Sequence, residues 1–324
     1  LRGPDHSMAT GAGLSPCQIA GRHRCYEEAI SPMTYTIKQG DVLKQLRTIP
    51  EKSVQCCVTS PPYWGLRDYG VDGQIGLEES PAVYVEKMVN VFREVKRVLR
   101  DDGTFWLNVG DSYKNKALSL IPSRLIIALQ DDGWLVRSEI VWAKKAPMPE
   151  AVKDRPTSSW EPLFLLTKSG KYYYDADAVR TEGKEYTGRA GTFDRSGNGV
   201  ADHIIPNQSA AEHRPREDRV KAGANLRNVW HIGPEPFKDA HFATFPTEIP
   251  RKAILAGTKE GDVVLDPFCG SGTTLMVAEH LERDSIGIEL NPEYAEIAEK
   301  RVQSGLPLTR KKKWEGEFKL EQTS

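Results

Sequence analysis

The chain has 324 residues, of which 39% are hydrophobic and 27% charged, enough apolar material for one large domain or a domain with an insertion. A formal net charge of -1 excludes a global positive field, so any surface that binds nucleic acid must be a local patch. Five cysteines without metal-ligand spacing argue against a disulfide framework or a metal site, and no apolar run approaches the roughly 20 residues that span a bilayer. We therefore expect a cytoplasmic protein with no metal and no membrane partner.

Regular patterning begins at Tyr35 and alternates between strands and helices. YTIKQGD predicts a short strand and a turn, VLKQL a helical turn, and SVQCCVTS a buried strand. Apolar spacing predicts a helix from Tyr84 to Leu99, which residues 101–103 separate from the strand TFWLNVGD. A helix over 122–129 and the strand LVRSEIVWAK follow. This alternation predicts an α/β fold with a mostly parallel sheet.

Both ends of the chain and a long central segment break this pattern. Residues 1–32 lack the apolar core of a signal peptide, and we expect a disordered leader or an expression remnant there. Residues 170–228 are rich in Gly, Arg, Asp, Asn and His and poor in apolar residues. That composition predicts a long irregular insertion, either functional or a solvated disordered loop. Beyond residue 305 the chain is polar and basic.

Alternation returns with a helix predicted from Pro246 to Gly257. The following stretch, from GDVVLDPFCGSGTT to AEIAEKRV, is typical of a strand, a glycine loop, a helix, a strand and a helix. Gly270 and Gly272 would let a ligand approach the main chain closely. Glu289 closes the next strand, where a carboxylate can accept hydrogen bonds from ribose hydroxyls. A nucleoside ligand is therefore favoured over a plain tight turn.

The residues of the glycine loop narrow the choice of ligand. The helix opens with Gly-Ser-Gly-Thr-Thr and no lysine, which differs from a Walker phosphate loop, and the full Gly-x-Gly-x-x-Gly dinucleotide fingerprint is absent. Asp266 at the strand tip would repel a pyrophosphate and favour a cation. Together these features point to S-adenosylmethionine, which carries an amino group and a sulfonium.

The string TSPPYW at 59–64 follows a buried strand and is poor material for continuing a strand or a helix. A strand terminator or a polyproline segment is the structural alternative. Beside DPFCGSGTT, however, TSPPYW resembles the catalytic loop of the DNA amino-methyltransferases, which modify N6 of adenine or N4 of cytosine. The order, catalytic loop first and cofactor loop last, resembles that family's beta group, in which the methyltransferase fold is circularly permuted.

The resemblance implies a Rossmann-like methyltransferase fold with an irregular target-recognition insertion. The implied segments are a catalytic half at 33–169, the insertion at 170–228, a cofactor-binding half at 229–305 and a polar basic tail at 306–324. The implied function is site-specific, S-adenosylmethionine-dependent methylation of double-stranded DNA, at the nucleoid, by an orphan enzyme or by one half of a restriction pair. A homodimer is compatible with this family.

Cofactor residues follow from the same resemblance. Five positions match the family's cofactor loop: Asp266, Phe268, Gly270, Gly272 and Thr273. Glu289 matches the ribose-binding acid, and Asp41 matches the position that contacts the adenine, although Asp41 alone is equally compatible with a turn-forming aspartate. HFATFPTEIP resembles the segment before the cofactor loop, in which Thr244 and Phe245 line the methionine end. We expect His241 beside them to be structural.

Residues 60–63, which we call the clamp loop, suit the methylation of an exocyclic amine. An aromatic amine is a poor nucleophile because its lone pair is delocalised into the ring. The resemblance implies that Ser60 Oγ and the Pro61 carbonyl accept the two amine hydrogens and that Pro62 helps to stiffen the loop. Tyr63, with Trp64 as a second candidate, would stack on a base flipped out of the duplex. Transfer of the methyl group to an amine by direct displacement needs no protein nucleophile, whereas methylation at cytosine C5 needs a cysteine. The string SPCQ resembles the nucleophile loop of cytosine-C5 enzymes, but it lies in the leader without the supporting motifs.

Later residues extend the expected site toward DNA. Trp142 matches an aromatic position near the flipped base, although a core tryptophan is as compatible with the residue alone. Four basic side chains are expected to reach DNA phosphates, with a solvated charge run as the alternative: Lys144, Lys145, Lys153 and Arg155. Ser60 is associated more often with cytosine-N4 enzymes, but the target base stays open between cytosine and adenine. Methylation of RNA or of a protein amide, and a catalytically silent DNA-binding subunit, are the alternative functions.

Overall fold

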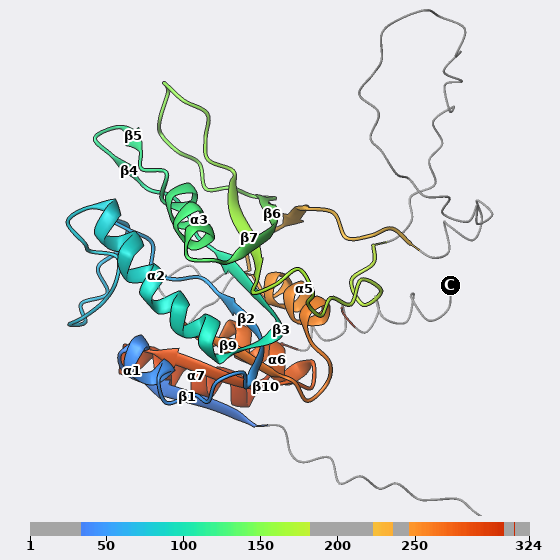
Figure 1. Cartoon of the computed structure of the whole chain (residues 1–324). Helices are drawn as coiled ribbons and strands as arrows, with labels where there is room; N and C mark the ends of the chain where they lie inside the picture. The colour runs from blue at the N-terminus through green and yellow to red at the C-terminus, as the bar shows by residue number, and fades with distance from the viewer. Residues whose placement is uncertain (1–33, 182–222, 236–245, 308–313, 315–324) are drawn as a thin grey trace, which may run out of the picture. The chain divides into compact units, whose positions relative to one another are not determined.

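A central sheet organises the computed structural model, which describes residues 34–181, 223–235, 246–307 and 314. Its spatial order is β1-β10-β9-β2-β3-β7-β6-β8 (Figure 1). In that order the strands are β1 (Tyr35–Gln39), β10 (Asp284–Glu289), β9 (Val263–Asp266), β2 (Val54–Thr59), β3 (Leu99–Asn108), β7 (Trp160–Thr167), β6 (Leu135–Lys144) and β8 (Val229–Ile232). Neighbouring strands run parallel except at β7, which is antiparallel to β3 and β6. The predicted α/β fold with a mostly parallel sheet is confirmed.

Helices cover both faces of the sheet. The apolar sides of α1 (Val42–Leu46), α2 (Pro81–Val98) and α3 (Ile121–Asp131) pack into one core cluster. Those of α5 (Glu248–Gly257), α6 (Thr273–His280) and α7 (Pro292–Ser304) pack into a second cluster (Figure 1). Alternation along β2 divides neighbouring residues between the faces, with Cys57 in the first cluster and Cys56 in the second. Coverage on both faces explains why every residue of β2 is buried.

Local signals account for the position of α2. Ser80 caps its first turn by accepting a hydrogen bond from Val83 N at 3.4 Å. Pro81 occupies the first helical position, where a backbone N–H would have no partner within the helix, so its missing N–H costs no hydrogen bond. In the last turn, Arg97 donates to the carbonyl oxygens of Leu46 and Ile49 at 2.9 and 3.1 Å. The helix is therefore tied to the end of α1, and both elements belong to the core cluster that also contains Val54 and Cys57 of β2.

The connection from α2 to β3 differs from the prediction. We expected residues 101–103 to separate the helix from a strand beginning at Thr104. Instead β3 begins at Leu99, directly after the helix. The register with β2 shifts between Val54↔Leu99 and Cys56↔Thr104, so residues 100–103 form a bulge on β3.

Two strands of the sheet were not predicted. β7 carries Pro162 in its interior, which is unusual for a central strand, and β8 has four residues, too few for a periodic signal. A small hairpin of β4 (Tyr113–Lys114) and β5 (Ala117–Leu118) was also missed. Within the described chain, no helix has the length and apolarity needed to cross a bilayer.

The predicted insertion is described at its two ends, 170–181 and 223–228. Backbone hydrogen bonds hold the first end on the body of the domain: Tyr173 N donates to Asp102 O and Asp175 N to Ala256 O, both at 2.8 Å. The remainder of the insertion, the predicted leader and most of the predicted tail lie outside the described residues. The segment boundaries therefore stay predictions.

Gly257 makes a tight contact between α5 and the sheet. A Cβ there would lie 2.4 Å from Thr104 Oγ1 and 3.3 Å from Cys56 Sγ. We expect Gly257→Ala to lower the free energy of unfolding by about 1–3 kcal/mol, because overpacking forces buried neighbours to move. Urea denaturation measures the change. Gly170→Ala is the control, since a methyl added there meets no described atom within 4 Å, and it should change the free energy by less than about 0.5 kcal/mol. Equal effects at both positions would contradict the contact.

Candidate functional site

The sheet brings both sequence motifs to one edge. β2 ends at Thr59, directly before the clamp loop, and β9 ends at Asp266, directly before the glycine loop. The two strands are parallel neighbours, so their loops meet although 207 positions separate Thr59 from Asp266. β10 and β6 end at this edge as well, while the reversed strand β7 begins there. Ligands of parallel α/β sheets bind at this edge.

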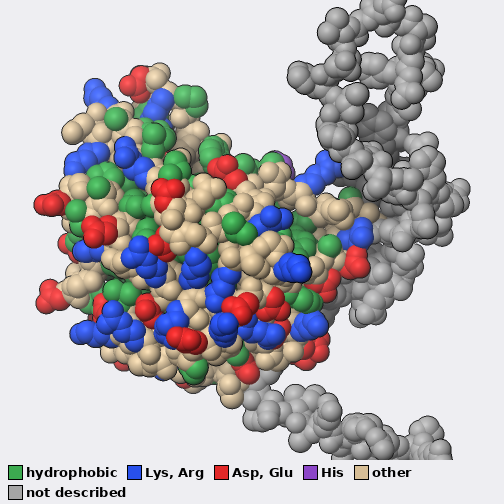
Figure 2. Space-filling model, in the orientation of Figure 1, with side chains coloured by type: hydrophobic (Ala, Val, Ile, Leu, Met, Phe, Trp, Pro, Cys, Tyr) green, Lys and Arg blue, Asp and Glu red, His purple; other side chains and the backbone are tan. Residues whose placement is uncertain are grey.

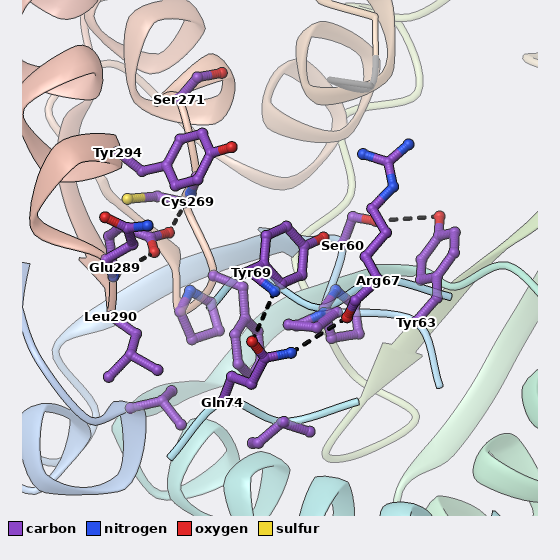
Figure 3. A pocket seen from close by; sticks show the side chains of 18 of the residues that line it. Ser60, Tyr63, Arg67, Tyr69, Gln74, Cys269, Ser271, Glu289, Leu290 and Tyr294 are labelled. Carbon is purple, nitrogen blue, oxygen red and sulfur yellow. Dashed lines mark hydrogen bonds between the residues drawn. The ribbon is translucent and has the colours of Figure 1, made fainter. Parts of the chain in front are cut away.

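A cavity of about 470 Å³ lies there. The predicted site residues that line it are Asp41, Ser60, Pro61, Pro62, Tyr63, Trp142, Lys144, Phe268, Gly270, Thr273 and Glu289. Figure 3 shows Ser60 and Tyr63 toward one end of the cavity and Cys269 and Glu289 toward the other. The clamp loop and the glycine loop therefore share one cavity, as the predicted function requires.

Glu289, the last residue of β10, is held by two backbone donors. Its Oε2 accepts from Gly270 N at 2.9 Å, and its Oε1 accepts from Asn291 N at 2.8 Å. Burial raises the pKa of Glu289, and these hydrogen bonds counteract the rise. Each carboxylate oxygen has two lone pairs, so acceptor capacity remains after both bonds are made. The predicted ribose-binding acid thus has a fixed orientation at the cavity wall.

The two glycines of the loop are required for different reasons. Both have positive φ, 50° at Gly270 and 77° at Gly272. Gly270 lines the cavity. A Cβ on Gly272 would lie 3.0 Å from Ala298 Cβ, and Gly272 is not among the lining residues. Gly272 therefore packs closely against α7, and its contact with the cofactor stays a prediction.

Asp266 is buried behind the glycine loop. Its exposed fraction is 1%, and it is not among the cavity-lining residues. Oδ1 accepts from Thr59 Oγ1 at 2.6 Å and from Phe268 N at 3.1 Å, while Oδ2 accepts from Thr274 Oγ1 at 2.7 Å. Burial raises the pKa of Asp266 to about 6, and the three hydrogen bonds oppose that rise. Its carboxylate therefore joins β2, the loop and α6, and the attraction of Asp266 for a cationic ligand stays a prediction.

Ser60 belongs to a group of polar side chains from three elements. Ser60 Oγ donates to Tyr63 OH at 3.2 Å, and Tyr63 OH has Glu161 Oε2 at 2.8 Å and Asn108 Oδ1 at 3.2 Å as acceptors. The Tyr63 ring packs on Gly110, where an added Cβ would lie 2.4 Å from ring carbon Cε2. Burial, together with the charge of Glu161, raises the pKa of Tyr63 well above its usual value, so the phenol keeps its proton. β3 and β7 thus fix the position of the clamp.

Trp64 lies in the core rather than in the cavity. Its exposed fraction is 3%, and its indole Nε1 donates to Glu78 O at 2.9 Å. This burial does not favour the stacking of Trp64 on a base, which stays a prediction. The other side of the clamp is anchored to α2, because Tyr84 OH donates to Pro62 O at 2.9 Å.

Part of the cavity wall was not predicted from the sequence. Gly65 N donates to Gly76 O at 2.7 Å and closes a loop directly after the clamp. The loop brings Arg67 and Tyr69 to the cavity, and Tyr294 of α7 also lines it (Figure 3). Four glycines between 65 and 76 were the available signal, since closely spaced glycines indicate tight turns.

Two of the predicted DNA-contacting residues lie inside the cavity. Trp142 is 7% exposed, and its Nε1 donates to Ile232 O at 3.1 Å. Lys144 Nζ forms an ion pair of 2.5 Å with Glu161 Oε1. Lys144 thus lies at the cavity, paired with Glu161, and its contact with DNA phosphates stays a prediction.

The other three basic residues lie outside this cavity. Lys145 lines a second cavity beside β8, and Lys153 is exposed. Arg155 donates to Glu150 Oε2 at 2.6 Å and lies 4.0 Å from the centre of the Tyr113 ring. On the face shown in Figure 2, basic and acidic side chains are intermingled. Contacts of these residues with DNA stay predictions.

Thr244, Phe245 and His241 lie outside the described residues, so their predicted roles are untested. In the part of the chain that the structure describes, His, Cys, Asp and Glu side chains form no group that could hold a metal ion.

The raised pKa of Asp266 makes the stability of the fold depend on pH. The carboxyl titrates near 3.8 in the unfolded chain and near 6 in the fold, so the stabilising effect of its protonated form is complete below pH 3.8 and lost as the pH rises through 6. Relative to Asp266→Asn, the wild type should lose up to about 3 kcal/mol of unfolding free energy between pH 4 and pH 7. Urea denaturation of both proteins over this range measures the difference. A difference that does not vary with pH would contradict the burial of this charge.

Comparison with known proteins supports the chemistry that this cavity suggests. Residues 54–300 match the family model described as DNA methylase, of the N6/N4 type. The chain is 45% identical to the Type II methyltransferase M.Cfr9I of Citrobacter freundii, covering 91% of this chain and 96% of the relative. It is 39% identical to the Type II methyltransferase M.SmaI of Serratia marcescens, covering 81% and 89%.

Solved structures share the fold. The PvuII DNA methyltransferase, described as cytosine-N4-specific, matches with a TM-score of 0.61 at 22% identity, over 83% of this chain and 88% of that one. A putative DNA modification methylase of Thermus thermophilus, solved with S-adenosyl-L-methionine, matches with a TM-score of 0.57 at 26% identity, over 85% and 97%. The chain therefore belongs to the DNA methylase family and is a DNA methyltransferase, as the clamp and the glycine loop predicted.

Proposed function

We propose that this methyltransferase transfers the methyl group of S-adenosylmethionine to N4 of a cytosine flipped out of double-stranded DNA. One observation carries the proposal: a single cavity holds the clamp, Ser60 to Tyr63, together with Gly270 and Glu289. The Thermus thermophilus neighbour was solved with the same methyl donor that the sequence predicts. Cytosine is preferred to adenine because the first clamp residue is serine, which is associated more often with the cytosine-N4 enzymes of the resembled family.

The residues at the glycine-loop end fit S-adenosylmethionine. Glu289 presents acceptor oxygens for ribose hydroxyls, and Phe268 adds an apolar wall. Asp41 also lines the cavity, directly after Gly40, whose backbone N donates to Glu289 O at 2.8 Å, and it caps α1 by accepting from Lys44 N at 2.9 Å through Oδ1. Its Oδ2 takes no part in that cap and suits the amino group of an adenine ring. When bound, the cofactor supplies a methyl group activated by a sulfonium.

At the other end, the clamp prepares the amine. Ser60 Oγ and the Pro61 carbonyl accept one amine hydrogen each, which localises the nitrogen lone pair and directs it at the methyl group. A bond forms between the nitrogen and the methyl carbon while the bond from sulfur to that carbon breaks. The protein contributes position and hydrogen bonds rather than a covalent intermediate.

The described cysteines support direct displacement. Burial raises the pKa of Cys56 to about 12 and the pKa values of Cys57 and Cys269 well above their usual range. A thiol in such surroundings is a poor nucleophile at neutral pH. Methylation at cytosine C5, which begins with attack by a thiolate, is not supported by these residues.

Access of the base to this cavity requires flipping. The exocyclic amine of a base lies inside the duplex, and extrusion costs a few kcal/mol that contacts with the flipped base offset. Trp142 contributes a fixed aromatic ring at the cavity wall, and Tyr63 a second one. Residues 170–228 are the proposed target-recognition region.

Two finer assignments and one alternative belong to the same proposal. The relatives from Citrobacter freundii and Serratia marcescens are bacterial proteins, and an enzyme that methylates bacterial DNA works at the nucleoid in the cytoplasm. Homodimerisation, expected from the family resemblance, stays a prediction that light scattering of the purified protein would decide. Methylation of RNA or of a protein amide remains the alternative if DNA is not a substrate.

The methylated product and the role of Ser60 can be tested together. After incubation of DNA with the enzyme and S-adenosylmethionine, nucleoside mass spectrometry should detect N4-methylcytosine. Ser60→Ala should lower the methylation rate about 10²-fold, because a preorganised hydrogen-bond partner of the reacting group is lost. Ser304→Ala, an exposed position on α7, is the control and should keep the wild-type rate. N6-methyladenine would overturn the choice of base, and 5-methylcytosine the whole mechanism.

Glu289 can be tested by cofactor binding. In Glu289→Gln, one charged acceptor is replaced by an amide whose nitrogen faces a backbone donor. We expect the dissociation constant for S-adenosylmethionine to rise at least about tenfold, since hydrogen bonds to charged groups are worth about 1.5–3 kcal/mol. Isothermal titration calorimetry measures the constant. Glu296→Gln, on the exposed side of α7, should bind as the wild type does. Unchanged binding by Glu289→Gln would remove this residue from the cofactor site.

A further inference from the structure

A chain of hydrogen bonds connects the clamp serine with a carboxylate on β7. Ser60 Oγ lies 3.2 Å from Tyr63 OH, which in turn lies 2.8 Å from Glu161 Oε2. All three residues line the cavity. Glu161 belongs to neither sequence motif, and methyl transfer as described above leaves it without a role.

The carboxylate sets the direction of every bond in this chain. An ionised carboxylate has no hydrogen, so the Tyr63 hydroxyl must donate to Glu161. The Tyr63 oxygen then offers a lone pair to Ser60, which donates its single hydrogen there. With that hydrogen directed at Tyr63, the remaining positions around Ser60 Oγ are lone pairs. Glu161 therefore makes Ser60 a hydrogen-bond acceptor, which is what an amine donor in the cavity requires.

Neighbouring side chains support this orientation. Asn108 Nδ2 donates to Pro162 O at 3.0 Å, which turns its Oδ1 toward Tyr63 OH at 3.2 Å. Between the two acceptors of Tyr63, the shorter and charged contact with Glu161 is the stronger. Lys144 donates to Glu161 Oε1 at 2.5 Å, so both oxygens of the carboxylate have a donor and the side chain has one orientation.

We propose that Glu161 is a positioning residue which, through Tyr63, holds Ser60 as an acceptor and receives the proton that the target amine loses. This inference rests on the proposed function. When the methyl group is transferred, its electron pair stays on sulfur and the amine nitrogen becomes cationic. One of its protons passes to Ser60 Oγ, the Ser60 hydrogen passes to Tyr63, and the Tyr63 hydrogen passes to Glu161. The neutral Glu161 releases this proton to solvent, to which 18% of its side chain is exposed.

Two substitutions interrupt the chain at different points. Glu161→Gln keeps the size of the side chain and an acceptor oxygen but cannot take up the proton, and Tyr63→Phe removes one oxygen and keeps the ring on Gly110. Each should lower the single-turnover rate of DNA methylation about 10²-fold, the usual contribution of a positioned proton acceptor. The dissociation constant for S-adenosylmethionine should stay within about twofold of the wild-type value, because the hydrogen bonds of both side chains lead to the clamp, β3 and β6 rather than to the glycine loop.

The double variant shows whether Tyr63 and Glu161 act through one chain of hydrogen bonds or have independent effects on the rate. If Tyr63 and Glu161 act through one chain, the combined variant should be no slower than the slower single variant. The wild type should also show a solvent deuterium isotope effect on the single-turnover rate that both single variants lack. Glu139→Gln, an exposed position on β6, is the matched control and should keep the wild-type rate and isotope effect.

Some outcomes would contradict only the role of Glu161, and others would contradict the proposed function as well. A Glu161→Gln enzyme with the wild-type rate, or a double variant whose losses multiply, would overturn the chain and leave the proposed function in place. If Glu161→Gln does not fold, as judged by thermal unfolding, Tyr63→Phe and its isotope effect decide the same point. A wild-type enzyme that adds no methyl group to DNA would overturn the proposed function and this inference with it.

Discussion

The buried hydrogen bond from Thr59 Oγ1 to Asp266 Oδ1, 2.6 Å long, holds the two halves of the site together. Thr59 precedes the clamp and Asp266 precedes the glycine loop, so their side chains lock the ends of β2 and β9 in register. Thr274 donates to the other oxygen of the carboxylate and ties the first turn of α6 to the same point. Burying a carboxylate is costly, and three donors offset much of that cost. Such fixation matters, because a misplacement of about 1 Å can cost on the order of 10²-fold in rate.

This arrangement also explains why the order of the motifs along the chain is unimportant for the site. The geometry of the site depends on β2 and β9 being parallel neighbours in the sheet. Two strands can pair in this way whichever of them comes first in the sequence. The clamp loop comes early in the chain and the glycine loop late, yet their strands end at one edge. The reversed strand β7 contributes its first residues to that edge, which is how Glu161 reaches the clamp. A circularly permuted methyltransferase can therefore keep its active site.

Much of the fold and the outline of the site could be predicted from the sequence, because strand ends followed by glycine or proline loops are local signals and the two motifs identify the family. The direction of a side chain at a strand end is different. Asp266 faces Thr59, which is distant in sequence, so the turn inward could not be seen locally. Glu161 lies next to Pro162 in a run without clear alternation, and its strand was not predicted. Its place at the cavity depends on the antiparallel insertion of β7 between two parallel strands, which is a property of the whole sheet.

The charges in the cavity agree with the proposed reaction. Three carboxylates line it, those of Asp41, Glu161 and Glu289, against two basic side chains, those of Arg67 and Lys144. Since Lys144 is paired with Glu161, the excess of negative charge lies toward the glycine-loop end. On the proposed function, that excess stabilises a cationic methyl donor more than the neutral thioether that remains after transfer. On the same proposal, loss of the positive charge during methyl transfer would weaken this attraction and favour exchange of the spent product.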